Sequence, residues 1–299
     1  MSHVRIGSRG SDLALWQANH VKRQLEDLGC TVDITIIKTQ GDAIQHLSFD
    51  KLEGKGFFTK EIEQALLDGT IDLAVHSHKD LETNPPAGLS IAAVSEREDP
   101  ADLLLIARSA VDPDESWSLK SGAIVGTSSA RRKSQVVRFR NDVTIKDLRG
   151  NVPTRIQKLR DGQYDAILLA KAGVDRLQID LSEFEVVRLD PTEFVPAPAQ
   201  GVLALQIRDK DEKTSSIVAK MNHSDVQERI AVERKVLNLL QGGCQLPLGV
   251  FCGEDHIVYV SHAESWEDGS NWYKYEADDL EGLAELIVAD LQETTEELD

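Results

Sequence analysis

The sequence predicts an α/β fold in which two hinged lobes carry a smaller α+β domain at the carboxyl end. Three observations predict it. The 299 residues are enough for two or three domains. Segments typical of strands and helices alternate along the first two thirds of the chain, as in parallel α/β units. This alternation also occurs twice, in the same order, so we expect two lobes of similar build.

The two copies are related by three pairs of matching segments. Residues 7–11 match 126–131, residues 35–42 match 144–151, and residues 68–75 match 161–168. Each copy is expected to run strand, helix, strand, helix, strand. Gly41 and Gly69 lie 28 positions apart and Gly150 and Gly162 only 12, so the first copy carries a polar insertion around residues 47–58. Insertions of this kind are typical of mobile functional loops.

Two segments are expected to cross between the lobes, residues 96–100 and residues 194–201. Two crossings make a hinge with a ligand cleft between the lobes, as in periplasmic solute-binding proteins. We therefore expect lobe 1 at residues 1–96 and 199–214, with a returning strand at 202–207, and lobe 2 at 101–194. Residues 217–299 form the third domain: a helix at 226–240, strands near 250 and at 257–263, and an acidic amphipathic helix.

Bulk properties exclude several classes of function. The net charge of −18 argues against nucleic acid or an anionic membrane as partner, because both are bound through basic surfaces. No apolar run approaches the ~18 residues of a membrane span. Three cysteines are too few for a disulfide framework, and the first residues enter a strand pattern without a signal segment. We expect a soluble cytoplasmic protein, and a monomer because no interface motif stands out.

Basic residues gather at motif positions despite the acidic total. They lie at or near predicted strand ends or first helical turns, where open α/β sheets bind ligands. The set is Arg9, Lys79, Arg131, Arg132, Arg149, Arg155 and Arg176. Thr127, Ser128 and Ser129 precede a helix and offer hydroxyl and amide groups to an anion, and Asn151 after Gly150 can cap the next helix. A single arginine is most often a surface group, but the recurrence in both copies predicts a ligand with several carboxylates or phosphates.

The segment from Val75 to Asp80 ends the third strand of the first copy. Strand alternation predicts that His76, His78 and Asp80 share one face. The His-x-His pair has no clear third ligand, so we do not predict a metal. Asp80, expected to be ionised at neutral pH among cations, is suited to stabilising a positive charge that forms during a reaction.

Cys244 stands on a corner after Gly242 and Gly243, between a predicted helix and a predicted strand. The glycines allow a bulky group on the sulfur to approach the backbone. No second cysteine or histidine has metal-site spacing, which favours a thiol with its own chemistry. An inconsequential surface cysteine is the alternative interpretation.

With these residues considered together, the chain resembles the porphobilinogen deaminase (hydroxymethylbilane synthase) family. The matching segments are residues 9–17, 55–61, 76–80, 96–100, 126–132, 148–155 and 242–249, in the family's order. The chain departs from the family's pattern at Ala199, where glycine is frequent, at His78, where methionine is frequent, and at Leu81, which is not followed by the usual proline.

The resemblance implies a transferase that joins four porphobilinogen molecules head to tail, with loss of ammonia, into a linear tetrapyrrole. It implies a dipyrromethane cofactor bound covalently to Cys244 through a thioether, Asp80 as the catalytic carboxylate, and Lys55 and Phe58 on a mobile loop. The implied contacts for acetate and propionate groups are Arg9, Ser11, Lys79, Thr127, Ser129, Arg131, Arg132, Arg149, Arg155 and Arg176.

Two other functions are compatible with parts of the sequence. A non-enzymatic anion-binding protein would have the same hinged lobes, but it would leave Cys244 and Asp80 without a task. Phosphoryl transfer by residues 127–132 lacks the spacing of a phosphate-loop lysine and an evident metal cluster.

Overall fold

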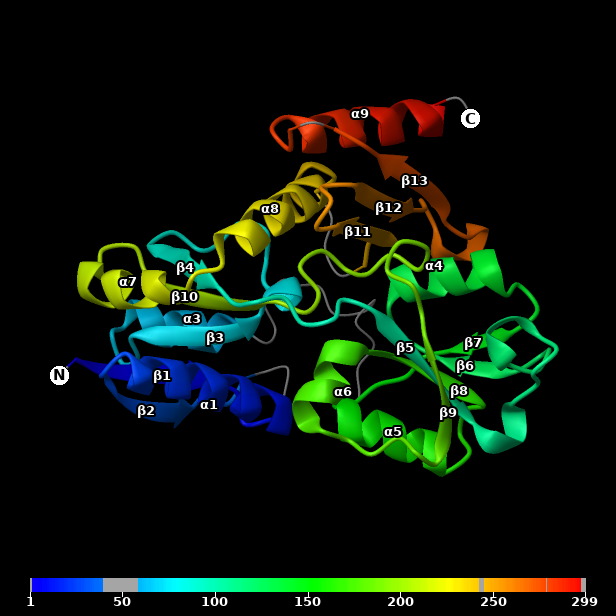
Figure 1. Ribbon diagram of the computed structural model, residues 1–299, viewed down its shortest axis with the longest axis horizontal. Coiled ribbons are helices and arrows are strands. Elements are labelled where there is room, and N and C mark those ends of the chain that lie inside the picture. The colour runs from blue at the N-terminus through cyan, green and yellow to red at the C-terminus, as the bar shows by residue number, and fades with distance from the viewer. Residues whose placement is uncertain (1, 40–58, 242–244, 278, 297–299) are drawn as a thin grey trace. The chain divides into compact units, whose positions relative to one another are not determined.

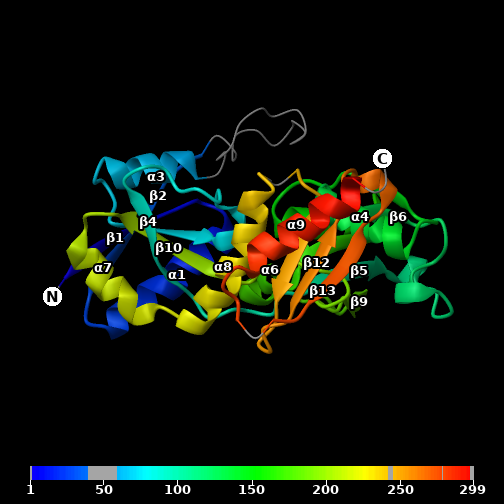
Figure 2. The same ribbon diagram turned by 90° about the horizontal axis from the view of Figure 1, so that it is seen from above.

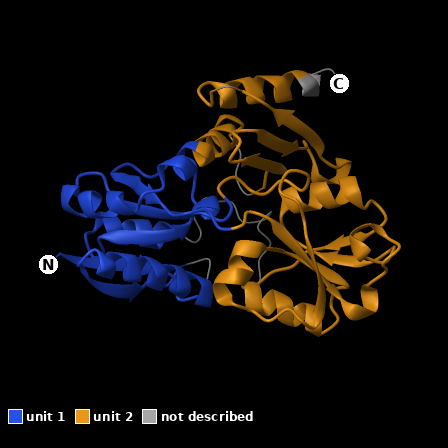
Figure 3. Cartoon of the chain, viewed as in Figure 1, with its two compact units in different colours: residues 1–98, 200–228 blue, residues 99–199, 229–299 orange. Residues whose placement is uncertain are grey.

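The computed structural model describes residues 2–39, 59–241, 245–277 and 279–296 (Figure 1). The chain divides into two compact units, Met1–Glu98 with Gln200–Glu228 and Asp99–Ala199 with Arg229–Asp299 (Figure 3). It therefore passes between units after Glu98, after Ala199 and again after Glu228. The predicted fold class, two α/β lobes with a smaller α+β domain, is confirmed by three separate sheets.

Unit 1 contains a sheet of five strands in the order β2-β1-β3-β10-β4 over the described residues. The strands are β1 His3–Ser8, β2 Thr31–Ile36, β3 Leu73–Ser77, β4 Leu89–Val94 and β10 Leu203–Arg208. β1 runs parallel to β2 and β3, whereas β10 is antiparallel to both of its neighbours, β3 and β4. The predicted return of residues 202–207 to lobe 1 as a strand is thus confirmed.

Helices cover both faces of this sheet. They are α1 Asp12–Asp27, α3 Lys60–Leu67 and α7 Glu212–Val218. α1 begins at Ser11, whose hydroxyl accepts a hydrogen bond from the Ala14 amide, and it buries Ala18, Val21 and Leu25 against the sheet. α3 buries Ile62 and Leu66 in a second cluster.

Unit 2 contains a sheet with the equivalent order, β7-β6-β8-β5-β9. The strands are β5 Asp102–Ala107, β6 Ile124–Gly126, β7 Thr144–Lys146, β8 Ala166–Ala170 and β9 Phe184–Arg188, and the helices are α4 Ala130–Phe139, α5 Val152–Arg160 and α6 Lys171–Leu177. α4 packs on one face of the sheet, and α5 and α6 pack on the other. β5 is buried almost throughout because both faces are covered.

The duplication holds at the level of single contacts. Gly7 and Gly126 occupy equivalent strand positions, and an added Cβ would lie 2.3 Å from Ile71 in one copy and 2.7 Å from Tyr164 in the other. Ile71 and Tyr164 are themselves partners in the sequence match. The two copies therefore share a packing contact that requires glycine on the strand.

The carboxyl-terminal region forms an antiparallel sheet of β11 Leu248–Cys252, β12 Val258–His262 and β13 Asn271–Tyr275. One face of the sheet packs against α8 Ser224–Leu239 and α9 Leu283–Glu296, with Val250, Val260 and Ile287 in the shared core (Figures 1 and 2). The predicted helix, two strands and acidic helix are confirmed. β13 was not predicted, because its inward tyrosines are half-buried and its outward residues are Trp272 and Lys274.

Candidate active site

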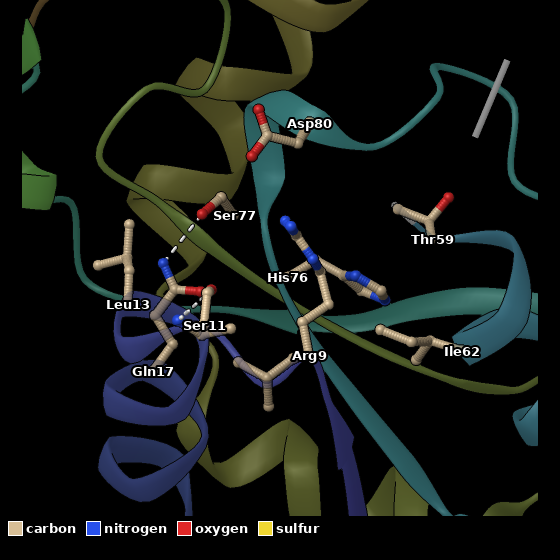
Figure 4. A pocket seen from close by; sticks show the side chains of 11 residues that line it. Arg9, Ser11, Leu13, Gln17, Thr59, Ile62, His76, Ser77 and Asp80 are labelled. Atoms are coloured by element: carbon tan, nitrogen blue, oxygen red, sulfur yellow. Dashed lines mark hydrogen bonds between the residues drawn. The ribbon is translucent and has the colours of Figure 1, made fainter. Parts of the chain in front are cut away.

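A pocket opens in unit 1 at the carboxyl ends of β1 and β3. Its cavity volume is about 80 Å³. Three predicted site residues line it: Arg9 after β1, Ser11 at the start of α1, and Asp80 after β3 (Figure 4). The pocket thus brings together a guanidinium group, a hydroxyl group and an exposed carboxylate from segments about 70 positions apart.

The expectation that residues 76, 78 and 80 share a strand face is wrong. β3 ends at Ser77, and His78–Asp80 form a single 3-10 turn. The Leu81 amide donates to the His78 carbonyl, and the His78 amide donates to the Val202 carbonyl of the neighbouring strand. This turn buries His78 and leaves Asp80 exposed at the pocket.

Lys79 lies in the same turn but does not line the pocket. Its ammonium group donates to the side-chain oxygen of Gln200 at 3.0 Å, next to the crossing segment. Gly201 follows with φ +93°, and a Cβ there would lie 2.4 Å from the Glu98 carbonyl oxygen. Lys79 therefore contacts the second predicted crossing segment, residues 194–201. Its contact with a ligand remains a prediction.

Two buried polar residues also line the pocket, Gln17 and His76. Sequence reasoning missed Gln17 and considered His76 only as part of a His-x-His pair. Gln17 donates from its amide to the Ser77 hydroxyl at 2.9 Å, a dashed contact in Figure 4. His76 is bonded through Nε2 to the side-chain oxygen of Gln206 at 3.1 Å. Burial, with a smaller contribution from the Arg9 charge, lowers the pKa of His76 to about 4, so this imidazole is neutral at physiological pH. The sequence signal at His76 was the His-x-His pattern, and that at Gln17 was its place in the matching segment 9–17.

In unit 2 the predicted anion-binding residues lie in the segments that follow strands β6, β7 and β8. They are Thr127, Ser128, Ser129, Arg131 and Arg132 after β6, Arg149, Gly150, Asn151 and Arg155 after β7, and Arg176 after β8. Arg176 lies in the last turn of α6 and not in a first turn. The locations at the carboxyl ends of parallel strands follow the general rule for ligand sites in α/β sheets.

Several of these residues also support the local fold. Ser129 and Asn151 cap α4 and α5 through their side chains, which confirms the predicted cap at Asn151. Ser128 exchanges hydrogen bonds with the backbone of Leu148. Gly150 has φ +116°, and an added Cβ would lie 2.7 Å from Thr154, so the turn requires glycine.

Arg131 and Arg132 share a buried partner that the sequence did not reveal, Asp102 at the start of β5. The carboxylate of Asp102 is fully buried, 2.9 Å from a nitrogen of Arg131 and 2.7 Å from one of Arg132. Burial alone would raise the pKa of Asp102, but the two guanidinium charges outweigh it and hold that pKa well below its usual range. The Arg132 Nε is buried and has no hydrogen-bond partner among the residues that the structure describes.

Other predicted site residues lie outside the described residues. These are Cys244, with Gly242 and Gly243, and the loop residues Lys55 and Phe58. In the part of the chain that the structure covers, no group of three or more histidine, cysteine, aspartate or glutamate side chains could hold a metal ion. Searched over the same part, no helix has the length and apolar character needed to traverse a bilayer.

The fold and the site define an α/β protein with a pocket that places a guanidinium group and a hydroxyl group beside a carboxylate. Comparison with known proteins narrows this class. The family described as "Porphobilinogen deaminase, dipyromethane cofactor binding domain" matches residues 4–216. The chain belongs to the porphobilinogen deaminase family. The predicted family is confirmed, and with it the prediction of an enzyme, a transferase.

Curated relatives agree over most of the chain. A porphobilinogen deaminase of Nitratidesulfovibrio vulgaris is 45% identical over 83% of this chain and 77% of its own length. A porphobilinogen deaminase of Nitratiruptor sp. is 43% identical over 91% of this chain and 86% of its own length. That of Chromobacterium violaceum is 45% identical over 84% of this chain and 80% of its own length. Among solved structures, an ancestral arginine-binding protein covers 74% of this chain with 14% identity and a TM-score of 0.41, too remote a likeness to support an argument.

Proposed function

We propose that this chain joins four porphobilinogen molecules head to tail into the linear tetrapyrrole hydroxymethylbilane and releases ammonia at each addition. The growing chain starts from a dipyrromethane primer held by the Cys244 sulfur in a thioether. The observation that carries the proposal is the convergence of Arg9, Ser11 and Asp80 on one pocket, in a member of this family. Cytoplasmic location and a monomeric state belong to the same proposal.

The pocket residues have distinct tasks in this reaction. Porphobilinogen carries two carboxylates, and the Arg9 guanidinium and Ser11 hydroxyl can bind one of them. Loss of ammonia from porphobilinogen leaves an electron-poor methylene-pyrrole cation. The Asp80 carboxylate, exposed at the pocket, stabilises this positive charge as it forms. A preorganised charge of this kind contributes about 10²–10³ in rate.

The donor set of unit 2 suits the primer. When bound, dipyrromethane supplies the pyrrole end to which the substrate is joined. Its carboxylates call for guanidinium and hydroxyl groups, and the segments after β6 and β7 present these at the ends of parallel strands. The unpartnered Arg132 Nε, among the described residues, is a buried donor of the required type. Arg131, Arg149, Arg155 and Arg176 would hold the remaining carboxylates.

One experiment with two readouts tests the proposal. Intact mass and peptide mapping of the purified enzyme should show an added dipyrrole on the peptide that contains Cys244, and Cys244→Ser should lack it. Asp80→Asn should retain the added mass and lose about 10²–10³ in turnover of porphobilinogen. Asp68→Asn, an exposed aspartate at the end of α3, is the matched control and should behave as wild type. An active enzyme of unmodified mass would refute the covalent primer, and normal turnover by Asp80→Asn would refute the catalytic role.

A further inference from the structure

His76 is a pocket residue to which neither the resemblance nor the family match gives a task. Its imidazole is 6% exposed, lines the pocket, and has two ring nitrogens with different surroundings. Nε2 faces the Gln206 side chain on β10. Nδ1 makes no hydrogen bond to any residue that the structure describes, and this atom is not fully enclosed by protein. Nδ1 is therefore available to a molecule in the pocket.

The protonation of the two nitrogens is fixed by a chain of three side chains. The Gln206 amide nitrogen donates to a carboxylate oxygen of Glu63 on α3 at 3.0 Å. A carboxylate only accepts, so the amide orientation is determined and the Gln206 oxygen must face His76. An amide oxygen also only accepts, and His76 Nε2 must therefore carry the proton. Nδ1 of the neutral ring then has a free lone pair.

We propose that His76 is a hydrogen-bond acceptor in the pocket, held as the Nε2-protonated tautomer by Gln206 and Glu63, and that Nδ1 receives an N–H of the bound substrate. This inference rests on the proposed function for the identity of that substrate. Porphobilinogen has two donor groups, the pyrrole N–H and the aminomethyl ammonium. We assign the pyrrole N–H to Asp80, because that carboxylate stabilises the positive charge that develops on the pyrrole ring, and the ammonium is then the donor left for His76.

The charges in the pocket support a neutral acceptor at this place. Arg9 is a fixed cation that lines the same pocket and opposes protonation of His76. A second cation would repel an ammonium group, whereas an imidazole lone pair orients it without adding charge. Gln206 and Glu63 act only through His76 and are positioning residues.

The tautomer is tested without turnover. The ring ¹⁵N resonances of His76, assigned by their loss in His76→Gln, should show protonated Nε2 and unprotonated Nδ1 at pH 7. A proton on Nδ1 would overturn the proposal because that nitrogen would be a donor. In Gln206→Leu the preference for Nε2 should weaken, and an unchanged spectrum would remove Gln206 and Glu63 from their positioning role.

The substrate contact is tested with a matched pair of variants. In His76→Gln the side-chain amide lies where Nε2 of the histidine lies. In His76→Asn the shorter amide lies where Nδ1 lies. His76→Gln should keep the Gln206 contact and thermal stability, and raise KM for porphobilinogen about tenfold with little change in kcat. His76→Asn should be less stable, with KM within about threefold of wild type. His3→Gln and His3→Asn, on the exposed start of β1, are the controls.

The outcomes separate the two proposals. If His76→Asn is worse than His76→Gln in both stability and KM, the role of His76 is only structural and this inference fails. If the wild-type enzyme has no activity on porphobilinogen, the proposed function fails, and the ¹⁵N spectrum still decides whether Nδ1 is an acceptor.

Discussion

At the scale of single residues, Asp102 decides how two of the predicted ligand-binding arginines are held. Its carboxylate lies within 3 Å of both guanidinium groups and has no exposed surface. Arg131 and Arg132 also donate to the backbone carbonyls of Val195 and Leu168. Two cations against one anion leave a net positive charge at the start of α4, which is the sign that a carboxylate ligand requires.

Replacement of Asp102 should therefore be costly. Asp102→Asn leaves two buried guanidinium groups without a counter-charge and should lower the free energy of unfolding by about 3–5 kcal/mol, measured by urea denaturation. Glu183→Gln is the control, because Glu183 pairs with Arg160 on the surface, where solvent screens the two charges, and it should leave the stability close to that of wild type. A loss below about 1 kcal/mol in Asp102→Asn would contradict the role given to this carboxylate.

At the scale of elements, an aspartate just before the third strand of each copy accepts a hydrogen bond from the first strand. The Asp72 carboxylate accepts from the Arg5 amide at 3.0 Å, and Asp165 accepts from the Ile124 amide at 2.8 Å. In unit 1 the contact is extended by the guanidinium groups of Arg5 and Arg208, 2.7 Å and 3.2 Å from Asp72. The equivalent carboxylates thus fix the strand order from which the pocket is built.

Asp72 also makes the stability of unit 1 depend on pH. Burial would raise its pKa, but the contacts with Arg5 and Arg208 lower that pKa from 3.8 to about 2. Because the pKa of Asp72 is lower in the folded state than in the unfolded state, its ionised carboxylate stabilises the fold fully when the pH is above 3.8. This stabilisation is lost as the pH falls toward 2. Asp72→Asn should reduce the free energy of unfolding by roughly 1–3 kcal/mol at pH 6, and this deficit should shrink between pH 4 and pH 2. A deficit independent of pH would contradict the assignment.

Elements with a strong local signal could be predicted from the sequence, and contacts between distant elements could not. The Asn151 cap, the duplicated segments and the apolar periodicity located several strands and helices correctly. The turn at His78–Asp80 was missed because a tertiary contact with Val202 ends β3 early. Gln17 and Asp102 escaped notice, and the role of His76 could not be recognised, for the same reason: each depends on a partner 30 to 130 positions away.

At the scale of the whole molecule, the net charge is −18, although the substrate that we propose carries carboxylates. Attraction must therefore come from cations close to the ligand, such as Arg9 in the pocket, while distant carboxylates repel it. The distance dependence separates these effects. Salt screens charges beyond about 8 Å at 0.15 M ionic strength but only beyond about 30 Å at 0.01 M.

Removal of distant acid groups should therefore improve substrate binding only at low salt. Asp27, Asp209 and Glu212 are exposed at the end of the unit 1 sheet opposite the pocket, and their replacement by asparagine or glutamine changes the net charge from −18 to −15. At 0.01 M salt the triple variant should have a KM for porphobilinogen about two- to threefold below that of wild type, because less long-range repulsion opposes an anionic substrate. At 0.15 M the two KM values should coincide, and Arg9→Gln should raise KM at both salt concentrations. An equal effect of the triple variant on KM at both salt concentrations would mean that these carboxylates act at short range. Long-range repulsion by the acidic surface would then not oppose substrate binding.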